Sequence, residues 1–354
     1  MDRKIVRMFF VAIVGIATLQ AQPKNIIFMV GDGMGVAQVY TSIVAMQGKS
    51  NFERFPYTGF SKTYSYNDFT TDSGAGGTAL FTGEKVNNKA IALSPDGRKL
   101  ETLLEKAQKE GLSTGFVVST VVCCATPSAT YAHVSNRKEF DSITLQLSQS
   151  DIDFFSGGGA GYFEKANRKD SLSAMDTLRK RGFDVVYTLD ELEASNAEKI
   201  AAFFAPYYPA KYPERGDLLM EPSKKAIEHL SKNDKGFVLM IEGSQIDYGG
   251  HDTNITVLRN EVVEFDKVIG MVLDFAMKDG ETLVIVTADH ETGGLTLPHG
   301  NMEEGTVSAK FTTTNHTGLM VPVFAYGPGA ENFVGIMQNT DFLPKISKIM
   351  NWEK

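Results

Sequence analysis

Short apolar segments rich in β-branched residues alternate along this chain with longer amphipathic segments. The apolar segments are residues 25–30, 114–120, 236–241, 282–288 and 321–326. Their length and composition predict buried strands. Between them, apolar residues recur at helical spacing, as in Leu100, Leu103, Leu104 and Ala107, and again in Leu258, Val262, Phe265, Ile269 and Val272. This alternation predicts an α/β fold with a mostly parallel central sheet flanked by helices on both faces.

The first 21 residues have the pattern of a signal peptide. Basic residues occur at Arg3, Lys4 and Arg7, an apolar run follows at 8–17, and small residues suit cleavage after Ala21. A buried helix or a membrane anchor is the alternative, but the run is too short to span a bilayer. The pattern therefore predicts export to the periplasm or the extracellular space.

The remaining chain, residues 22–354, is predicted to form a single catalytic domain, since α/β proteins of this length are built around one sheet. Residues 151–215 form a less regular elaboration, containing a glycine run and an aromatic, proline-bearing stretch at 203–213. The sequence does not indicate what this elaboration does.

Charge and cysteine content exclude two classes of protein. The net charge of -8 argues against a nucleic-acid partner, because binding to a phosphate backbone needs clustered Lys and Arg. An anionic substrate would then need local positive charge, most simply from metal ions. The only cysteines are the neighbours Cys123 and Cys124, which are too close for ordinary disulfide geometry. Disulfides are therefore not expected to stabilise this fold.

Unusual polar clusters follow three of the predicted strands. Asp32 follows the first strand, residues 242–251 follow the strand at 236–241, and Asp289 and His290 follow the strand at 282–288. Ligands of open α/β sheets bind beyond the carboxyl ends of the strands. Carboxylate and imidazole groups suit zinc, and an all-oxygen subset suits magnesium. Each cluster alone could form a turn, but together they indicate a metal-rich pocket.

The spacing within two clusters agrees with a shared ion. Asp247 and His251 are four residues apart, so one helical turn presents both on one face. Asp289 and His290 are adjacent, and a loop after a buried strand could direct both to one ion. The alternative for the second pair is that Asp-His-Glu merely caps a helix.

Ser73 precedes a run of small residues, Gly74 to Ala79, that predicts the start of a helix. A serine in this position can act as a helix N-cap. It can also act as a nucleophile, because backbone N–H groups and the helix dipole would hold a phosphate beside its oxygen. No histidine lies nearby in the sequence to act as its base, and a zinc ion could activate the hydroxyl instead.

These residues fall in six blocks that resemble, in order and local spacing, the alkaline phosphatases. The blocks are Gly31-Asp32-Gly33-Met34-Gly35, Thr71-Asp72-Ser73-Gly74-Ala75, Ala125-Thr126-Pro127 with Tyr131-Ala132-His133 and Arg137, residues 242–247 with His251, residues 288–294, and His316. One block alone is only moderately specific, whereas all six in order are very specific. The resemblance runs from about residue 24 to the C-terminus.

The resemblance implies a role for each matching residue. Ser73 is the expected nucleophile, and Arg137 is expected to hold two phosphate oxygens with its planar guanidinium. The expected ligands are Asp247, His251 and His316 for a first zinc, Asp289, His290 and Asp32 with the Ser73 oxygen for a second zinc, and Asp32, Thr126 and Glu242 for one magnesium.

The implied activity is hydrolysis of phosphate monoesters to an alcohol and inorganic phosphate through a phosphoserine intermediate. Small phosphomonoesters are the expected substrates, inorganic phosphate is the expected product and inhibitor, and the family favours a homodimer. The alternatives are a phosphodiesterase or sulfatase of the same superfamily, or a non-catalytic protein that binds metal or phosphate. Arg137 favours the monoesterase, since a guanidinium fork suits two free phosphate oxygens.

Three features depart from the family pattern. Cys124 stands where relatives often carry Asp or His beside the magnesium site, and Tyr248 follows Asp247 where relatives vary among Lys, His and Trp. The connection from His290 to His316 is shorter than in relatives whose insertion there forms part of the dimer interface. These departures leave the third metal site and the route of dimerisation open.

Overall fold

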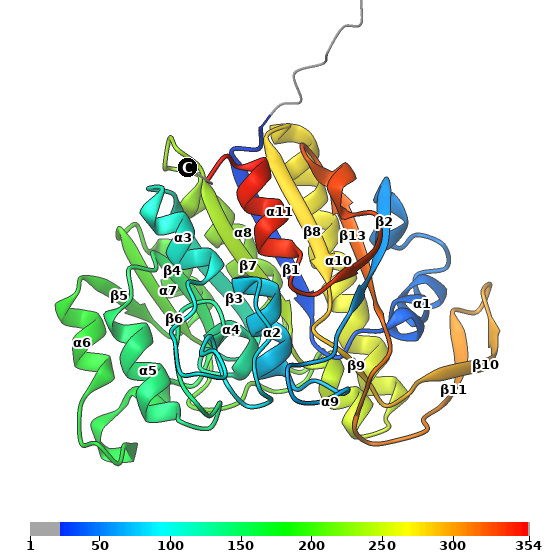
Figure 1. The fold of residues 1–354 in the computed structure, drawn as a ribbon, viewed down its shortest axis with the longest axis horizontal. Coiled ribbons are helices and arrows are strands. Elements are labelled where there is room, and N and C mark those ends of the chain that lie inside the picture. The colour runs from blue at the N-terminus through cyan, green and yellow to red at the C-terminus, as the bar shows by residue number, and fades with distance from the viewer. Residues whose placement is uncertain (1–21, 353–354) are drawn as a thin grey trace, which may run out of the picture.

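The computed structural model describes residues 22–352, so the predicted signal peptide lies outside the described residues. Within these residues, a ten-stranded sheet runs through the molecule in the order β14-β2-β13-β8-β1-β7-β3-β4-β6-β5 (Figure 1). None of the helices between residues 22 and 352 is long and apolar enough to cross a membrane.

Seven neighbouring strands form the parallel part of the sheet. They are β1 (Asn25–Gly31), β3 (Ser113–Val121), β4 (Phe154–Gly158), β5 (Phe183–Val186), β6 (Lys199–Phe203), β7 (Phe237–Gly243) and β8 (Thr282–Thr287). On the far side of β8, β13 (Val321–Tyr326) runs antiparallel to both β8 and β2 (Tyr57–Lys62), and β14 (Gly335–Gln338) completes that edge. The predicted mostly parallel sheet is confirmed.

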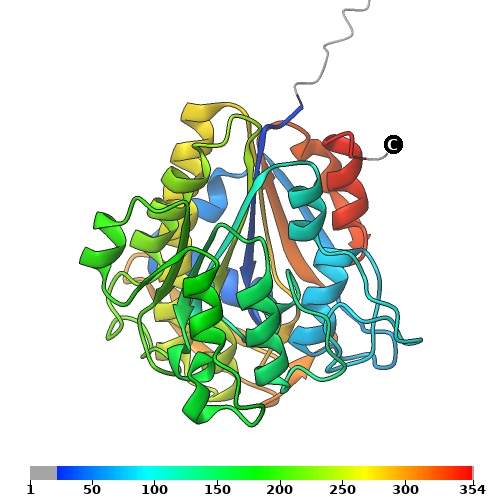
Figure 2. The same cartoon turned by 90° about the vertical axis from the view of Figure 1, so that its left-hand side faces the viewer.

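Helices cover both faces of this sheet (Figures 1 and 2). One face carries α2 (Ser73–Thr82), α3 (Leu103–Lys109), α5 (Phe140–Gln149), α6 (Ala174–Lys180) and α11 (Phe342–Ile349). The other carries α1 (Val36–Ala45), α7 (Leu189–Ala194), α8 (Met220–Leu230) and α10 (Ile255–Asp279). Alternate residues of β1 divide between the two cores: Ile26 and Phe28 enter the first, and Ile27 the second. The two-sided burial explains why these strands are continuous apolar runs.

Residues 151–215 contain more regular structure than their sequence pattern indicated. They supply β4, β6 and β5, which extend one side of the sheet, together with α6 and α7. The stretch after β6 returns to α10, where Arg215 forms a buried ion pair of 2.5 Å with Glu261 and a second one with Glu264. This contact fixes the stretch between Phe203 and Arg215 at both of its ends.

The buried carboxyl of Glu264 should give the fold a measurable pH dependence. Burial raises its pKa to about 7 despite the opposing charge of Arg215. The folded state therefore binds more protons than the unfolded state, and stability falls as pH rises from about 4.5 to about 7. Glu264→Gln is expected to remove most of this slope, which is on the order of 3 kcal/mol.

Urea unfolding at pH 4.5 and pH 7.5 measures the effect, with the exposed Glu193→Gln on α7 as the matched control. An unchanged difference between the two pH values in Glu264→Gln would show that another group causes the slope.

Short helices and strands lie within the loops at the carboxyl end of the sheet. They are α4 (Ala125–Ser128), α9 (Ile246–His251), β9 (Glu291–Thr292) and β12 (His316–Thr317). A separate hairpin of β10 (Thr296–Asn301) and β11 (Thr306–Lys310) projects from the body near α1 (Figure 1). The chain leaves β9, forms this hairpin and returns as β12, which pairs with β9 so that His316 lies opposite Thr292.

Candidate metal centre and nucleophile

Asp247, His251 and His316 form one compact cluster. Asp247 and His251 lie on one turn of α9, as their spacing predicted, with His251 Nε2 3.2 Å from Asp247 Oδ2. His316 arrives on β12, and its Nε2 atom lies 3.2 Å from His251 Nε2 and 3.6 Å from Asp247 Oδ1. The structure thus brings together two predicted ligands that are four residues apart in one helix and a third that lies 65 residues further along the chain.

The imidazoles of this cluster are oriented by backbone carbonyl groups. Nδ1 of His251 donates to the carbonyl of Thr314 at 2.6 Å, and Nδ1 of His316 donates to the carbonyl of Thr71 at 2.9 Å. With Nδ1 of each ring engaged in this way, Nε2 of each ring faces the other ring and Asp247. Hydrogen bonds from the far nitrogen of the ring to a carbonyl fix the tautomer of metal-binding histidines.

Asp32, Asp289 and His290 form a second cluster at the ends of β1 and β8. Nε2 of His290 lies 3.2 Å from Asp289 Oδ2 and 3.5 Å from Asp32 Oδ1. Among residues 22–352, Oδ1 of Asp32 and Oδ2 of Asp289 are buried without a hydrogen-bond partner. The rings of His290 and His316 stack with centroids 3.5 Å apart, so the two clusters adjoin.

Burial and crowding raise the pKa values of the carboxyl groups in this centre. A bound cation would lower these pKa values again. Burial, reinforced by Asp289 and Asp247, raises the pKa of Asp32 well above its usual range. Burial and Asp247 raise the pKa of Asp289 to about 6, and burial raises the pKa of Glu242 to about 8. Buried charges of one sign need a counter-charge, and a divalent ion supplies it.

The pKa values of His290 and His251 are shifted in opposite directions. Burial, together with His316, holds the pKa of His290 well below its usual value, so its ring is neutral. The hydrogen bond to Asp247 raises the pKa of the half-buried His251 to about 9. Burial would raise the pKa of Asp247, but its hydrogen bond to His251 and the neighbouring His290 and His316 lower it. Asp247 is therefore ionised, and His290 presents a lone pair.

Thr126 and Glu242 lie outside the two compact clusters. Glu242 ends β7, its Oε2 accepts a hydrogen bond of 2.7 Å from Ser244, and its charge contributes to the raised pKa of Asp32. Thr126 is the second residue of α4, whose N-cap is Cys124. Cys124 is half-buried and contributes to the raised pKa of Asp32 as well. Glu242 and Cys124 are thus close enough to Asp32 to act on its charge, and Thr126 interacts with Glu242.

Ser73 is the first residue of α2 and lies beside the second cluster. Its Oγ atom is 3.2 Å from His290 Nε2. The N-cap is Asp72, whose Oδ1 accepts a hydrogen bond of 3.0 Å from the amide of Ala75. Ser73 is therefore not the N-cap, which was the alternative interpretation of its position in the sequence.

Glycine allows α2 to approach the end of β8. A Cβ atom at Gly76 would lie 3.0 Å from the carbonyl oxygen of Asp289, and one at Gly77 would lie 3.3 Å from Ala129. Larger residues would push the helix, and Ser73 with it, away from the cluster. The run of small residues after Ser73 is therefore a requirement of close packing.

Asp72 links Arg137 to the helix that begins at Ser73. Its Nη1 atom lies 3.2 Å from Asp72 Oδ2, and its backbone amide donates to the carbonyl of Lys89 at 2.7 Å. Lys89 in turn donates its amide to both carboxylate oxygens of Asp72 at 3.1 Å. Asp72 thus caps the helix of Ser73 and orients Arg137 at the same time.

The structure gathers six of the predicted metal ligands into the two compact clusters, and it leaves Thr126 and Glu242 outside them. Sequence reasoning did not assign roles to Asp72, Thr292 or Glu291. Thr292 donates a hydrogen bond of 2.5 Å to Asp247 Oδ1. The one indication of these three residues in the sequence was that they lie within the motif blocks, next to the predicted site residues.

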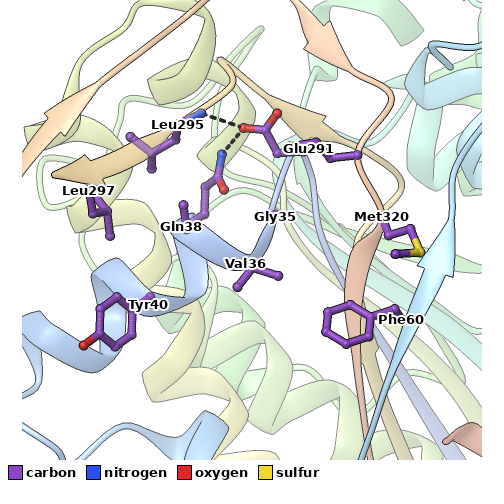
Figure 3. Close-up of a pocket in the computed structure, with 11 residues that line it drawn as sticks. Gly35, Val36, Gln38, Tyr40, Phe60, Glu291, Leu295, Leu297 and Met320 are labelled. Carbon is purple, nitrogen blue, oxygen red and sulfur yellow. Dashed lines mark hydrogen bonds between the residues drawn. The ribbon is translucent and has the colours of Figure 1, made fainter. Parts of the chain in front are cut away.

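Glu291 ties the loop after His290 to the start of α1. Its Oε1 accepts hydrogen bonds from Gln38 Nε2 at 2.8 Å and from the amide of Leu295 at 3.1 Å (Figure 3). Glu291 and Gln38 also line an apolar cavity of about 460 Å³, whose other lining residues include Val36 and Tyr40 (Figure 3). The hydrogen bond from Gln38 holds the loop that carries Asp289 and His290 against α1.

Known proteins match this chain over most of its length. The family model described as alkaline phosphatase matches residues 23–310. Alkaline phosphatase 4 of Bacillus subtilis is 32% identical over 95% of this chain and 90% of its own, and the alkaline phosphatase of Escherichia coli is 31% identical over 90% and 84%.

Solved structures agree with the sequence relatives. The alkaline phosphatase of the Antarctic bacterium TAB5 is 37% identical, with a TM-score of 0.88 over 94% of this chain and 100% of that one. The alkaline phosphatase of Thermus thermophilus, at 22% identity and a TM-score of 0.85, supports the fold alone.

Proposed function

Because this chain belongs to the alkaline phosphatase family and hydrolyses phosphate monoesters, we propose that it does so through a phosphoserine at Ser73. The observation that carries the proposal is the position of the Ser73 hydroxyl. It lies 3.2 Å from His290 Nε2, inside a buried group of carboxylates and imidazoles and beside the guanidinium that Asp72 orients.

The donor groups fit two zinc ions and one magnesium ion. The first zinc would be held by Asp247, His251 and His316, the second by Asp32, Asp289 and His290, and magnesium by Asp32, Thr126 and Glu242. Facing imidazole nitrogens suit zinc, and the partnerless oxygens of Asp32, Asp289 and Glu242 suit divalent cations in general. A mutant of the TAB5 alkaline phosphatase binds Mg in its M3 site.

When bound, the ions would make the Ser73 hydroxyl and a water molecule more acidic and would neutralise charge on the phosphoryl group. Ser73 Oγ attacks phosphorus, the ester P–O bond breaks, and the alcohol leaves with a proton. The N-terminal amides of α2 and the guanidinium of Arg137 stabilise the equatorial oxygens. Water then attacks the phosphoserine and releases inorganic phosphate, which binds the same groups and so inhibits.

Arg137→Ala is expected to lower kcat/KM for phosphomonoesters by about 10- to 150-fold, or roughly 1.5–3 kcal/mol, because a charged hydrogen-bond pair is lost. Inhibition by inorganic phosphate should weaken in parallel, since the product is the same dianion. Steady-state rates and phosphate inhibition constants measure both effects.

Arg137→Lys is the matched control, since it keeps the charge and loses the planar fork. Diesters offer one fewer free oxygen, so any diester turnover should suffer less. Equal losses on monoester and diester substrates would contradict recognition of the dianion by Arg137.

We also propose that the chain is exported and forms a homodimer. Export rests on the pattern of residues 1–21, and N-terminal sequencing of the secreted protein tests it. The homodimer rests on the apolar surface around the start of α1, where Val36 and Tyr40 are about half exposed beside Phe60 and Leu319. Sedimentation analysis tests the dimer, and a monomer at micromolar concentration would contradict it.

A further inference from the structure

The helix α9 carries Asp247 and His251, yet it is too short to hold its own position. It has six residues, of which Gly249 and Gly250 are two. Isolated helices of fewer than about 12 residues are marginal in water, and glycine lowers helix stability further. The position of Asp247 and His251 must therefore come from contacts between α9 and the rest of the chain.

The two glycines bring α9 close against two neighbouring elements. A Cβ atom at Gly249 would lie 2.6 Å from the Cα atom of Leu258 on α10. A Cβ atom at Gly250 would lie 2.8 Å from the side-chain methyl group of Thr292 on β9. These are van der Waals contacts, which fix a distance rather than a direction.

Directional bonds at the start of α9 come from Gln245, its N-cap residue, whose side chain is buried. The side-chain amide of Gln245 donates to the carbonyl of Ser119 on β3 at 2.7 Å and to the carbonyl of Ala210 at 3.2 Å. The preceding residue, Ser244, donates its backbone amide to Ser119 Oγ at 2.9 Å. One buried amide thus connects the start of α9 both to the sheet and to the segment that follows β6.

That segment, residues 209–215, is itself anchored on α10. The backbone amide of Tyr212 donates to Glu261 Oε1 at 2.8 Å. The guanidinium of Arg215 donates to both carboxylate oxygens of Glu261, at 2.9 and 2.5 Å. Because Arg215 and Glu261 are buried, this bidentate pair is shielded from water. Gln245 therefore bonds to an acceptor whose position is fixed.

A second link joins the same segment to the far end of α9. Lys211 Nζ lies 2.5 Å from Oδ2 of Asp252, the C-cap of α9, and the two side chains are 39% and 54% exposed. Exposed ion pairs contribute little, because water screens them. We therefore expect Gln245 to contribute more than Lys211 to the position of α9.

We propose that Gln245 is a positioning residue of the catalytic centre. Its buried amide fixes the start of α9, and so sets the distance from the two metal ligands on α9 to His316. Because His316 arrives on β12, the cluster binds an ion tightly only when α9 is correctly placed. The inference rests on the proposed function, since it takes the cluster of Asp247, His251 and His316 to be a zinc site.

Gln245→Met tests the proposal, because it keeps the length of the side chain and removes both N–H donors. The zinc concentration that half-fills the first site is expected to rise about 10- to 100-fold, as for other residues that orient metal ligands. The ligands of the second zinc lie outside α9, so that ion should be retained. At saturating zinc, kcat should return to within about threefold of the parent. Metal analysis during chelator competition measures occupancy, and steady-state kinetics in excess zinc measure kcat.

Gln146→Met is the matched control. Gln146 lies on α5, across the sheet from α10, and it accepts from the backbone amide of His133 at 2.8 Å and donates to its carbonyl at 3.3 Å. This variant also loses glutamine hydrogen bonds to the backbone, so it should unfold at a lower temperature than the parent. Its zinc titration should stay unchanged.

Lys211→Met gives a second measurement at an exposed position, where folding is not at stake. It should shift the zinc titration in the same direction by about twofold. An unchanged titration in Gln245→Met, or an equal shift in Gln146→Met, would overturn the positioning role. If Gln245→Met does not fold, an unchanged titration in Lys211→Met would overturn it instead. Failure of the proposed function would look different, since the parent would then bind zinc no better than His316→Ala.

Discussion

Ser73→Ala is expected to lower phosphomonoester turnover by about 10³-fold or more, which corresponds to roughly 4 kcal/mol of transition-state stabilisation. The hydroxyl lost is the only group of Ser73 near His290 Nε2, and the amides of α2 remain in place. Asp72 continues to cap the helix, so stability should change by less than about 1 kcal/mol. Steady-state kinetics and thermal unfolding measure the two effects.

The covalent step can be tested directly on the same pair of proteins. Acid quenching during turnover of a labelled phosphomonoester should trap phosphate on Ser73 in the parent and none in Ser73→Ala. Ser135→Ala, at an exposed serine near Arg137, serves as the control and should retain both activity and label. Label on a different residue of the parent would mean that the nucleophile has been wrongly assigned.

Removal of divalent metals should have an equally large effect, lowering activity by at least about 10³-fold. The physical reason is the burial of Asp32, Asp289 and Glu242, because a cation relieves their mutual repulsion and pairs with the one buried oxygen of each that has no hydrogen-bond partner. The metal-free protein should also unfold at a lower temperature, since ions that bind only the folded state stabilise it. Zinc with magnesium should restore both properties better than either ion alone.

Two histidine variants sharpen this test. His316→Ala should lose part of the bound zinc, because Nε2 of His316 faces His251 and Asp247. His299→Ala, on the exposed β10, should keep its full metal content. Metal analysis after dialysis distinguishes the two without reference to activity. Full activity in metal-free protein, or equal zinc content in both variants, would refute the proposed centre.

Five strands were predicted from the sequence, and the structure contains them as β1, β3, β7, β8 and β13. β1, β3, β7 and β8 are six to nine residues long and continuously apolar, so their composition alone marks them. β5 and β6 have only four and five residues, and β5 buries only its first and last residues, so residues 151–215 gave no clear pattern. The antiparallel edge formed by β2 and β13 depends on pairing across more than 250 residues, which no local pattern contains.

The candidate site was more readable than the fold around it, for a related reason. Its residues follow strand ends in short blocks, and Asp247 and His251 share one helical turn. The partners that orient them come from distant segments: Thr71 for His316, and Lys89 for Arg137. The position of Ser73 beside His290 likewise depends on α2 packing against the end of β8. Such contacts follow from tertiary packing, which a linear pattern does not record.

The order of the strands separates two tasks that a hydrolase must perform. The residues around the nucleophile follow β1, β7 and β8 in the middle of the sheet, whereas Tyr162 and the exposed Tyr207 and Tyr208 follow β4 and β6 near one margin. A change of sequence on that margin need not disturb the centre. The segment between β4 and α8 can thus vary in sequence without moving the strands that carry the predicted catalytic residues, which makes it the natural place for evolution or engineering to alter this protein.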